Sequence, residues 1–272
     1  MTALRRSLLA LAVALVVVAV GVAVSIPFDG WLNRDRVAAL TNAVADGATP
    51  VAVYLARPAV AEGPLPVVVM IHEFWGLNEA LLSKADLLAA DGYLVVAPDT
   101  LRGTTTRWLP KALWHSLGTP DERVIEDLDA VVAWLRTRDD VDPERVVVMG
   151  FCYGGGKALA YALARPAVPA GTAVFYGGLS DDADALARLE GPVLGIFGRD
   201  DTLVTPAEVD GFQAALRQAG VEHVLLTFDG VGHAFVTSAD GISSDATQAA
   251  AWGAWTAWLR EVTLARAGGD TP

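Results

Sequence analysis

The stretch Arg145-Val-Val-Val-Met-Gly-Phe-Cys-Tyr-Gly-Gly-Gly-Lys157 indicates the fold more clearly than any other part of the sequence. Its first half is a continuous apolar run that predicts a buried strand, and Ala158–Ala164 after it predicts a helix. Between them, Gly150-Phe-Cys-Tyr-Gly154 has the G-x-C-x-G pattern of a tight turn that presents a nucleophile between a strand and a helix. Glycines are needed there because side chains would collide with the neighbouring strand or helix.

Cys152, at the centre of this turn, is the single cysteine of the chain. A lone buried cysteine is more often inert packing. Here the thiol would lie at the N-terminus of a helix, where the helix dipole favours the thiolate. The surroundings therefore predict a nucleophile. One cysteine also excludes an intramolecular disulfide and a cysteine-based metal cluster.

Apolar runs on both sides of this stretch predict the rest of a sheet. Most of them are continuously apolar rather than alternating, as expected for a parallel sheet covered by helices on both faces. We therefore expect an α/β fold built from right-handed crossovers. The predicted strands are Val51–Leu55, Val67–Ile71, Tyr93–Ala97, Arg145–Met149, Thr172–Tyr176, Val193–Phe197 and His223–Phe228.

Helices between these strands have recognisable start signals. Thr119-Pro-Asp-Glu122 and Thr205-Pro-Ala-Glu208 each predict a capping box, with threonine at the N-cap and glutamate three residues later. A last helix is predicted near Thr247–Ala265. Residues 100–118 contain neither a clear strand nor a clean helix. We expect this segment to be a loop over the strand ends, where active-site loops usually lie.

A separate hydrophobic segment occupies the N-terminus. Leu8–Ile26 contains no charged residue and, as a helix, would span about 28 Å, close to the thickness of a bilayer core. Two arginines precede it and charges of both signs follow it. We predict that residues 1–30 form a signal-anchor or transmembrane helix, with the rest of the chain outside the cytoplasm. Two alternatives remain open: cleavage at Ala23-Val-Ser25, which would give a secreted protein, and burial as a core helix.

Composition limits the remaining possibilities. Residues 31–50 are expected to be a short linker, 51–265 a single α/β domain, and 266–272 a tail. The net charge of −12 disfavours nucleic acid as a partner, because an acidic chain repels phosphate backbones. Hydrophobic residues make up 53% of the chain, which provides material for a core and excludes a disordered chain. We expect a monomer.

A cysteine nucleophile needs a base, and the base needs an acid to orient it. His233 lies in Asp229-Gly-Val-Gly-His-Ala-Phe235, a glycine-rich loop directly after a predicted strand. Asp200 and Asp201 follow the strand Val193–Phe197. The chain order of nucleophile, acid and histidine matches that of α/β-hydrolases. We predict a catalytic triad of Cys152, His233 and an aspartate.

Three separated motifs resemble the dienelactone hydrolase family, over a region from about Val51 to about Leu264. The motifs are Ile71-His-Glu-Phe-Trp-Gly-Leu77, Gly150-Phe-Cys-Tyr-Gly-Gly155 and Gly232-His-Ala-Phe235. The resemblance implies an α/β-hydrolase fold and the hydrolysis of a small ester or lactone through a thioester acyl-enzyme. In that family the acid lies three residues before a valine, which selects Asp201 over Asp200 as the triad acid.

The resemblance also implies a role for Glu73. In the family this glutamate contacts the resting cysteine and helps it to become a thiolate when substrate arrives. A carboxylate beside a thiol opposes a second negative charge until one of the two moves. The alternative is that Glu73 is a salt-bridge residue at the rim. The oxyanion hole would be formed by the backbone N–H groups of Phe74 and Tyr153.

Substrate recognition departs from the family pattern. The type enzymes hold a substrate carboxylate with two arginines. Arg102 lies one place from the first expected position, and Thr237 occupies the second, with no arginine nearby. We therefore expect a preference for uncharged esters or lactones, with Arg102 and Thr237 as candidate substrate ligands.

Acyl transfer by such a triad requires neither a cofactor nor a metal, and none is expected. Two other kinds of function compete with the hydrolase. One is a redox-sensing thiol domain tethered to the membrane, in which Cys152 is oxidised reversibly. The other is a non-catalytic binding or scaffold module that keeps only the fold.

Overall fold

The computed structural model describes residues 2–33, 35–47, 49–61 and 63–267. Within these residues the chain forms one eight-stranded sheet in the order β1-β2-β4-β3-β5-β6-β7-β8. Neighbouring strands from β4 to β8 pair in parallel, whereas β1 and β2 form an antiparallel edge. The predicted α/β fold with a mostly parallel sheet is confirmed.

The strands are β1 (Ala43–Ala45), β2 (Val51–Ala56), β3 (Leu65–Ile71), β4 (Leu94–Pro98), β5 (Val141–Phe151), β6 (Gly171–Phe175), β7 (Val193–Gly198) and β8 (His223–Phe228). The helices are α1 (Thr2–Leu32), α2 (Arg36–Leu40), α3 (Glu79–Ala90), α4 (Leu109–Leu117), α5 (Asp121–Arg136), α6 (Tyr153–Ala164), α7 (Ala183–Leu186), α8 (Pro206–Ala219), α9 (Ala239–Ser244) and α10 (Ala246–Ala267).

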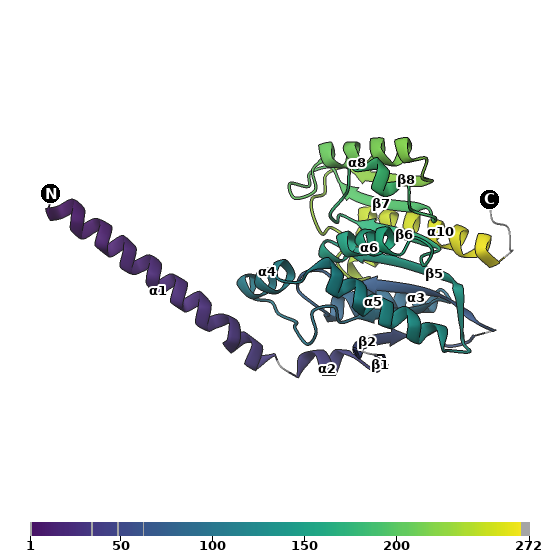
Figure 1. The fold of residues 1–272 in the computed structure, drawn as a ribbon, viewed down its shortest axis with the longest axis horizontal. Coiled ribbons are helices and arrows are strands. Elements are labelled where there is room, and N and C mark those ends of the chain that lie inside the picture. The colour runs from purple at the N-terminus through teal and green to yellow at the C-terminus, as the bar shows by residue number, and fades with distance from the viewer. Residues whose placement is uncertain (1, 34, 48, 62, 268–272) are drawn as a thin grey trace.

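Helices cover both faces of the sheet, as the apolar runs predict (Figure 1). Successive residues of a strand point to opposite faces, so that Met70 of β3 belongs to one apolar core and Ile71 to another. The first core packs against α3 and α10 and contains the fully buried Trp255. The second packs against α5 and α6. Phe212 of α8 is buried in a third cluster with Val174 of β6.

The register of the central strands brings two loops together. In the parallel pair β3–β5, Ile71 lies opposite Gly150. Glu73 and Cys152 each follow two residues later, so they leave the same edge of the sheet side by side. The loops after β3, β5 and β7 therefore converge at the carboxyl ends of the strands, where ligands bind in open α/β sheets.

The structure differs from the sequence prediction in two segments. Residues 31–50 were expected to be a linker, but they contain α2 and the edge strand β1. Asn42 fixes this strand by bonding to both backbone groups of Leu55, at 2.8 Å and 3.0 Å. Residues 100–118 were expected to be a loop, but they contain α4.

One of the two predicted capping boxes is present. Thr205 accepts a hydrogen bond from the backbone of Glu208, and the Glu208 carboxylate accepts one from the backbone of Thr205. The prediction for Thr119 is wrong, because α5 begins at Asp121 with Pro120 as its N-cap. The Thr119 hydroxyl instead donates to the His115 carbonyl at 2.6 Å and closes the end of α4.

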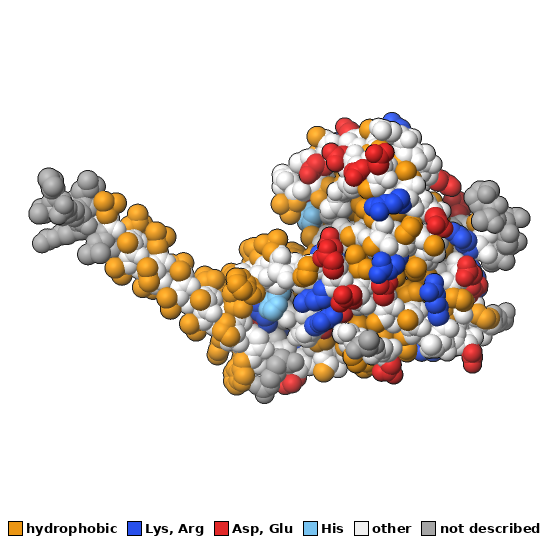
Figure 2. Space-filling model, in the orientation of Figure 1, with side chains coloured by type: hydrophobic (Ala, Val, Ile, Leu, Met, Phe, Trp, Pro, Cys, Tyr) orange, Lys and Arg blue, Asp and Glu red, His pale blue; other side chains and the backbone are white. Residues whose placement is uncertain are grey.

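Helix α1 extends away from the α/β domain (Figure 1). Its stretch Leu11–Leu32 has a mean hydropathy of 2.7 and is 0% buried, so the alternative of a core helix is wrong. Apolar side chains cover it on the side seen in Figure 2. This stretch is long and apolar enough to cross a membrane.

Candidate active site

Cys152 lies in a strained turn between β5 and α6. Its backbone has φ 53° and ψ −115°, a combination that L-residues rarely adopt, and its N–H donates to the Phe175 carbonyl at 2.9 Å. A Cβ atom at Gly150 would lie 2.2 Å from the Gly154 carbonyl carbon. One at Gly154 would lie 2.3 Å from the Ile71 carbonyl oxygen. Both glycines are therefore required by close backbone contacts, as the tight turn predicts.

His233 and Asp201 form a hydrogen-bonded pair. The distance from His233 Nδ1 to Asp201 Oδ2 is 2.8 Å. The other Asp201 oxygen accepts the backbone N–H groups of Leu203 at 2.8 Å and Val204 at 3.0 Å, so the carboxylate is fixed in place. Asp201 is buried, whereas Asp200 is exposed. The structure thus places Asp201, and not its neighbour, against the histidine.

The second ring nitrogen of His233 is unpaired among the described residues. Nε2 is buried and forms no hydrogen bond with any of the residues that the structure describes. The carboxylate on Nδ1 can only accept, so the neutral ring carries its proton there and leaves a lone pair on Nε2. The ring of Tyr176 packs edge-on against the imidazole at 5.3 Å between centroids. His233 is therefore held as an oriented proton acceptor.

The Cys152 thiol is neutral at rest. Burial raises its pKa to about 11, and the charge of Glu73 adds to this rise. Hydrogen bonding from the backbone of Tyr153 and of Phe74 lowers the pKa in opposition. These are the two N–H groups expected to form the oxyanion hole. Both N–H groups are hydrogen-bonded to the sulfur of Cys152, the atom that would attack a carbonyl.

Glu73 has an unexpected charged neighbour. Burial raises the pKa of Glu73, and the positive charge of Lys84 opposes this. Lys84 is only 2% exposed, donates to the Val236 carbonyl at 3.1 Å, and lies 3.7 Å from the centre of the Phe151 ring. Burial lowers the pKa of Lys84 to about 8. The sequence offers one indication that Lys84 is buried: it lies three residues after Leu81 and four before Leu88, so it shares their face of α3.

His72 fixes the backbone that carries Glu73 and Phe74. It is buried, and its Nδ1 lies 2.7 Å from the Glu73 carbonyl oxygen. The backbone N–H of Thr100 donates to Nε2 at 3.3 Å, so the proton of the neutral ring belongs on Nδ1. Burial lowers the pKa of His72 to about 4, which keeps the ring neutral. His72 therefore joins the end of β3 to the end of β4 and positions the loop between Ile71 and Leu77.

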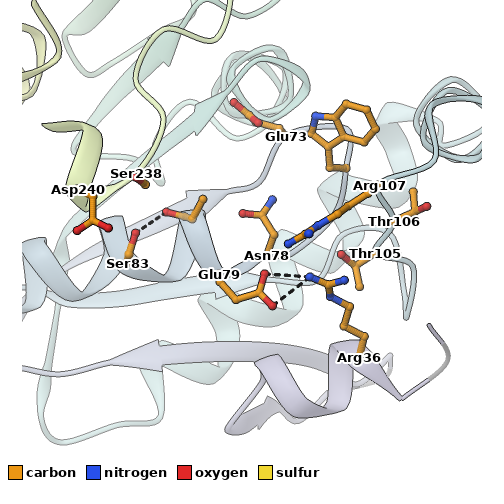
Figure 3. Close-up of a pocket in the computed structure, with 12 residues that line it drawn as sticks. Arg36, Glu73, Asn78, Glu79, Ser83, Thr105, Thr106, Arg107, Ser238 and Asp240 are labelled. Atoms are coloured by element: carbon orange, nitrogen blue, oxygen red, sulfur yellow. Dashed lines mark hydrogen bonds and ion pairs between the residues drawn. The ribbon is translucent and has the colours of Figure 1, made fainter. Parts of the chain in front are cut away.

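A cavity of about 620 Å³ opens beside Glu73. It extends over the start of α3 to the start of α9, and the loop before α4 forms part of its wall (Figure 3). Arg36 and Arg107 contribute two positive charges to the lining, and Glu73, Glu79 and Asp240 contribute three carboxylates. Arg36 Nη2 lies 3.0 Å from each carboxylate oxygen of Glu79.

The two residues predicted to bind substrate do not line this cavity. Arg102 forms an ion pair with Asp127 at 2.7 Å, and the side chain of Asp127 is fully buried. The guanidinium of Arg102 is therefore needed to neutralise an interior carboxylate. The Thr237 hydroxyl bonds to Gln248 at 3.0 Å. These contacts do not favour either assignment, which stays a prediction, and among the predicted site residues only Glu73 lines the cavity. The arginines in its lining are Arg36 and Arg107, which the motif comparison did not single out.

Comparison with known proteins agrees with this architecture. The model of the dienelactone hydrolase family matches residues 51–263. A protein of Escherichia coli K12 named "Putative carboxymethylenebutenolidase" is 33% identical over 196 residues, which are 67% of this chain and 72% of that protein. A protein of the same name from Methylorubrum extorquens is 34% identical over 204 residues, covering 70% and 69% of the two chains.

Among solved structures, the crystal structure of "Putative Dienelactone Hydrolase" from Klebsiella pneumoniae superposes with a TM-score of 0.71. Its sequence is 26% identical, and the match covers 80% of this chain and 99% of that one. The fold, the G-x-C-x-G turn at Cys152 and the sequence relatives all indicate the same family. The chain belongs to the dienelactone hydrolase family of the α/β-hydrolase superfamily.

Proposed function

We propose that this protein hydrolyses a small carboxylic ester or lactone, with Cys152 as nucleophile, His233 as base and Asp201 as the orienting acid. The observation that carries the proposal is the state of His233. Its Nδ1 is bonded to a buried carboxylate, and its buried Nε2 has no partner among the described residues. An oriented imidazole with one free nitrogen is what a thiol nucleophile needs as a proton acceptor.

The reaction begins when the Cys152 proton moves to Nε2 of His233. The thiolate attacks the carbonyl carbon of the ester, and the negative charge that develops on the carbonyl oxygen is stabilised by the N–H groups of Phe74 and Tyr153. As the C–O bond breaks, the leaving alkoxide takes the proton from His233. The acyl group remains on sulfur as a thioester. Water then gives a proton to His233, attacks the thioester, and releases the acid while the thiol is restored.

Glu73 controls when this happens. Burial of the sulfur, with the charge of Glu73 adding to it, holds the pKa of Cys152 at about 11, so the free enzyme has little thiolate at neutral pH. Substrate entering from the cavity meets Glu73, which lines it. Displacement of the carboxylate from the sulfur removes this repulsion and favours the thiolate. The nucleophile is thus formed when substrate is present.

The raised thiol pKa also argues against the redox-sensing alternative. Oxidation of cysteine proceeds through the thiolate, and sensor cysteines have low pKa values and exposed sulfur atoms. Cys152 has the opposite properties at rest. A hydrolase that forms its thiolate only with substrate accounts for both the triad and the raised pKa.

The test is a hydrolysis screen with the full chain in detergent micelles or vesicles. The panel contains p-nitrophenyl esters, uncharged lactones and dienelactone, and the control is Cys152→Ala. We expect turnover that is lost in Cys152→Ala, together with an acylated Cys152 detectable by mass spectrometry after rapid acid quenching. Absence of cysteine-dependent turnover across the panel would remove the proposal.

We also propose that α1 anchors the domain in a membrane, with the α/β domain outside the cytoplasm. The exposed apolar stretch Leu11–Leu32 supports the anchor. The indole N–H of Trp108 donates to the Ser25 hydroxyl at 2.8 Å, a contact that signal-peptide cleavage near Ser25 would disturb. Mass spectrometry of the protein from membranes tests this, because an intact N-terminus is expected and a chain that starts near residue 26 would show cleavage.

A further inference from the structure

Helix α4 has its polar and apolar faces reversed. Leu109, Leu113 and Leu117, spaced four residues apart, are 48%, 42% and 84% exposed, and Trp114 is 68% exposed. Lys111, by contrast, is only 4% exposed and points into the protein. A surface helix in water normally buries its apolar stripe and exposes its charges. The apolar face of α4, formed by these three leucines and Trp114, therefore needs a covering that is not water.

The same helix is joined to the end of α1. Lys111 Nζ forms an ion pair with Asp29 of α1 at 3.1 Å, and the side chain of Lys111 is 6% exposed. The Thr106 hydroxyl donates to the same carboxylate oxygen, Asp29 Oδ2, at 2.7 Å. Trp108 adds its hydrogen bond to Ser25. Figures 1 and 2 show α4 on the side of the domain from which α1 extends, with apolar side chains on both.

We propose that the apolar face of α4 lies in the lipid interface of the membrane that α1 spans. This inference rests on the proposed membrane placement of α1. The polar junction at Asp29 marks the point where α1 leaves the hydrocarbon, because an ion pair is far more stable among headgroups than in acyl chains. Helix α4 is bonded to that point and is therefore at the level of the headgroups.

Composition favours lipid over water or another protein surface. Tryptophan is enriched at membrane interfaces, where its ring contacts acyl chains and its N–H remains hydrogen-bonded. Leu109–Leu117 contains no acidic residue, and the exposed Arg107 precedes it. This end of an otherwise acidic protein therefore suits an anionic lipid surface. A short helix with leucine and tryptophan outward has the character of an interfacial helix.

The contact would place the cavity at the bilayer. Thr105, Thr106 and Arg107 form part of the cavity wall and lead directly into α4. Thr106 is also the residue that bonds to Asp29. A substrate that partitions into the membrane would then reach the cavity beside Glu73 without crossing bulk water. The substrates best served are esters with an apolar acyl chain.

The single cysteine permits a direct test. In a Cys152→Ser background, the full chain carries Leu117→Cys or, as a matched control, Leu264→Cys, each labelled with a polarity-sensitive fluorophore. Leu264 is another exposed leucine, 61% accessible, on α10. The proteins are reconstituted in vesicles of phosphatidylcholine and phosphatidylglycerol. We expect the label at 117 to be quenched by headgroup nitroxide lipids and shielded from aqueous iodide, with the reverse at 264.

Three outcomes would overturn the inference. Equal access of iodide to both labels would show that α4 faces water. A label at 117 shielded from iodide but not quenched by nitroxide lipids would show that protein, such as a second copy, covers the helix. If the chain did not float with the vesicles, it would not be bound to the membrane, and the placement of α4 in the lipid interface would be wrong. None of these readouts depends on catalysis, because the background lacks the nucleophile.

A second measurement uses the active enzyme. Trp114→Gln combined with Leu117→Gln is expected to lower kcat/KM several-fold for a long-chain ester dissolved in the vesicles. The same variant should leave kcat/KM unchanged for a short, water-soluble ester. Leu264→Gln is the matched control and should affect neither substrate. A loss of equal size on both esters, or no loss on either, would contradict delivery from the membrane.

Discussion

At the scale of single residues, Cys152 and Glu73 are arranged so that one charge suppresses the other. Burial and the charge of Glu73 together raise the pKa of Cys152. Removing the negative charge of Glu73 lowers the thiol pKa, so a larger fraction of Cys152 is thiolate at a given pH near neutrality. We expect Glu73→Gln to react several-fold faster with iodoacetamide at pH 8, because the thiolate is the form that is alkylated. The midpoint of the alkylation profile should also move to lower pH.

The control for this experiment is Glu79→Gln. Glu79 lines the same cavity, but its carboxylate is paired with Arg36. Its replacement should leave the alkylation profile of Cys152 in place. Identical profiles for wild type and Glu73→Gln would contradict the role given to Glu73.

Asp201 offers a second comparison at this scale, because an aspartate stands next to it. Asp201→Asn replaces an acceptor with a group that can donate to Nδ1, and so favours the tautomer that protonates Nε2. We expect kcat to fall by about 1,000-fold or more, in line with the loss of the orienting acid in other triads. Asp200→Asn should change little, since Asp200 is exposed. Steady-state hydrolysis of a p-nitrophenyl ester gives kcat for both variants. A larger loss in Asp200→Asn than in Asp201→Asn would assign the orienting acid to Asp200.

At the scale of elements, Gly154 at the start of α6 and Gly253 inside α10 lead to opposite predictions for stability. Gly154→Ala places a Cβ 2.3 Å from one backbone oxygen and 2.6 Å from a second. Backbone atoms of β3 cannot move without breaking the sheet, so we expect a loss of about 3 kcal/mol or more in the free energy of unfolding. Gly253→Ala, inside α10, would place its Cβ more than 4 Å from every described atom beyond the local helix backbone, and should gain about 1 kcal/mol. Urea denaturation followed by circular dichroism compares the two, and a tolerated Gly154→Ala would contradict the packing argument.

The elements also show which patterns can be read from sequence. Continuous apolar runs located the parallel strands, since burial on both faces leaves an unbroken run. Helix α4 was missed because its leucines face outward, so the segment lacks the core-facing stripe by which a helix is usually recognised. Segments α2 and β1 are only 5 and 3 residues long, too short to form a periodic pattern. Both become visible only through the contacts they make with β2 and α3.

The residues of the candidate site also fall into those that could be predicted from the sequence and those that could not. Cys152, Asp201 and His233 follow strands within short motifs, so their convergence at one edge of the sheet could be predicted. The charged partners could not, because they come from distant parts of the chain. Lys84 bonds to a carbonyl 152 residues away, and Arg36 to a glutamate 43 residues away. Only the folded arrangement brings these groups to Glu73 and to the cavity.

At the scale of the whole molecule, charge decides which substrates are favoured. The chain has a net charge of −12, and the cavity lining has three carboxylates against two guanidinium groups. Arg36 is already paired with Glu79, and the pKa of Glu79 is lowered by its own backbone N–H and by that arginine. A substrate carboxylate would therefore lose hydration without gaining a free pair of donors. An uncharged ester or lactone avoids this cost.

We therefore expect kcat/KM for an uncharged lactone to exceed that for dienelactone, which carries a free carboxylate, by about tenfold, or about 1.4 kcal/mol in the transition state. Glu79→Gln releases Arg36 beside Arg107 and should narrow this gap. Glu122→Gln, an exposed residue in the first turn of α5, removes the same charge elsewhere and should leave the gap unchanged. If both variants narrow this gap equally, the net charge of the protein rather than the cavity sets the preference for the uncharged lactone. Added salt should then also reduce that preference. If wild type prefers the anion, Arg107 holds the carboxylate, and Arg107→Ala should remove that preference.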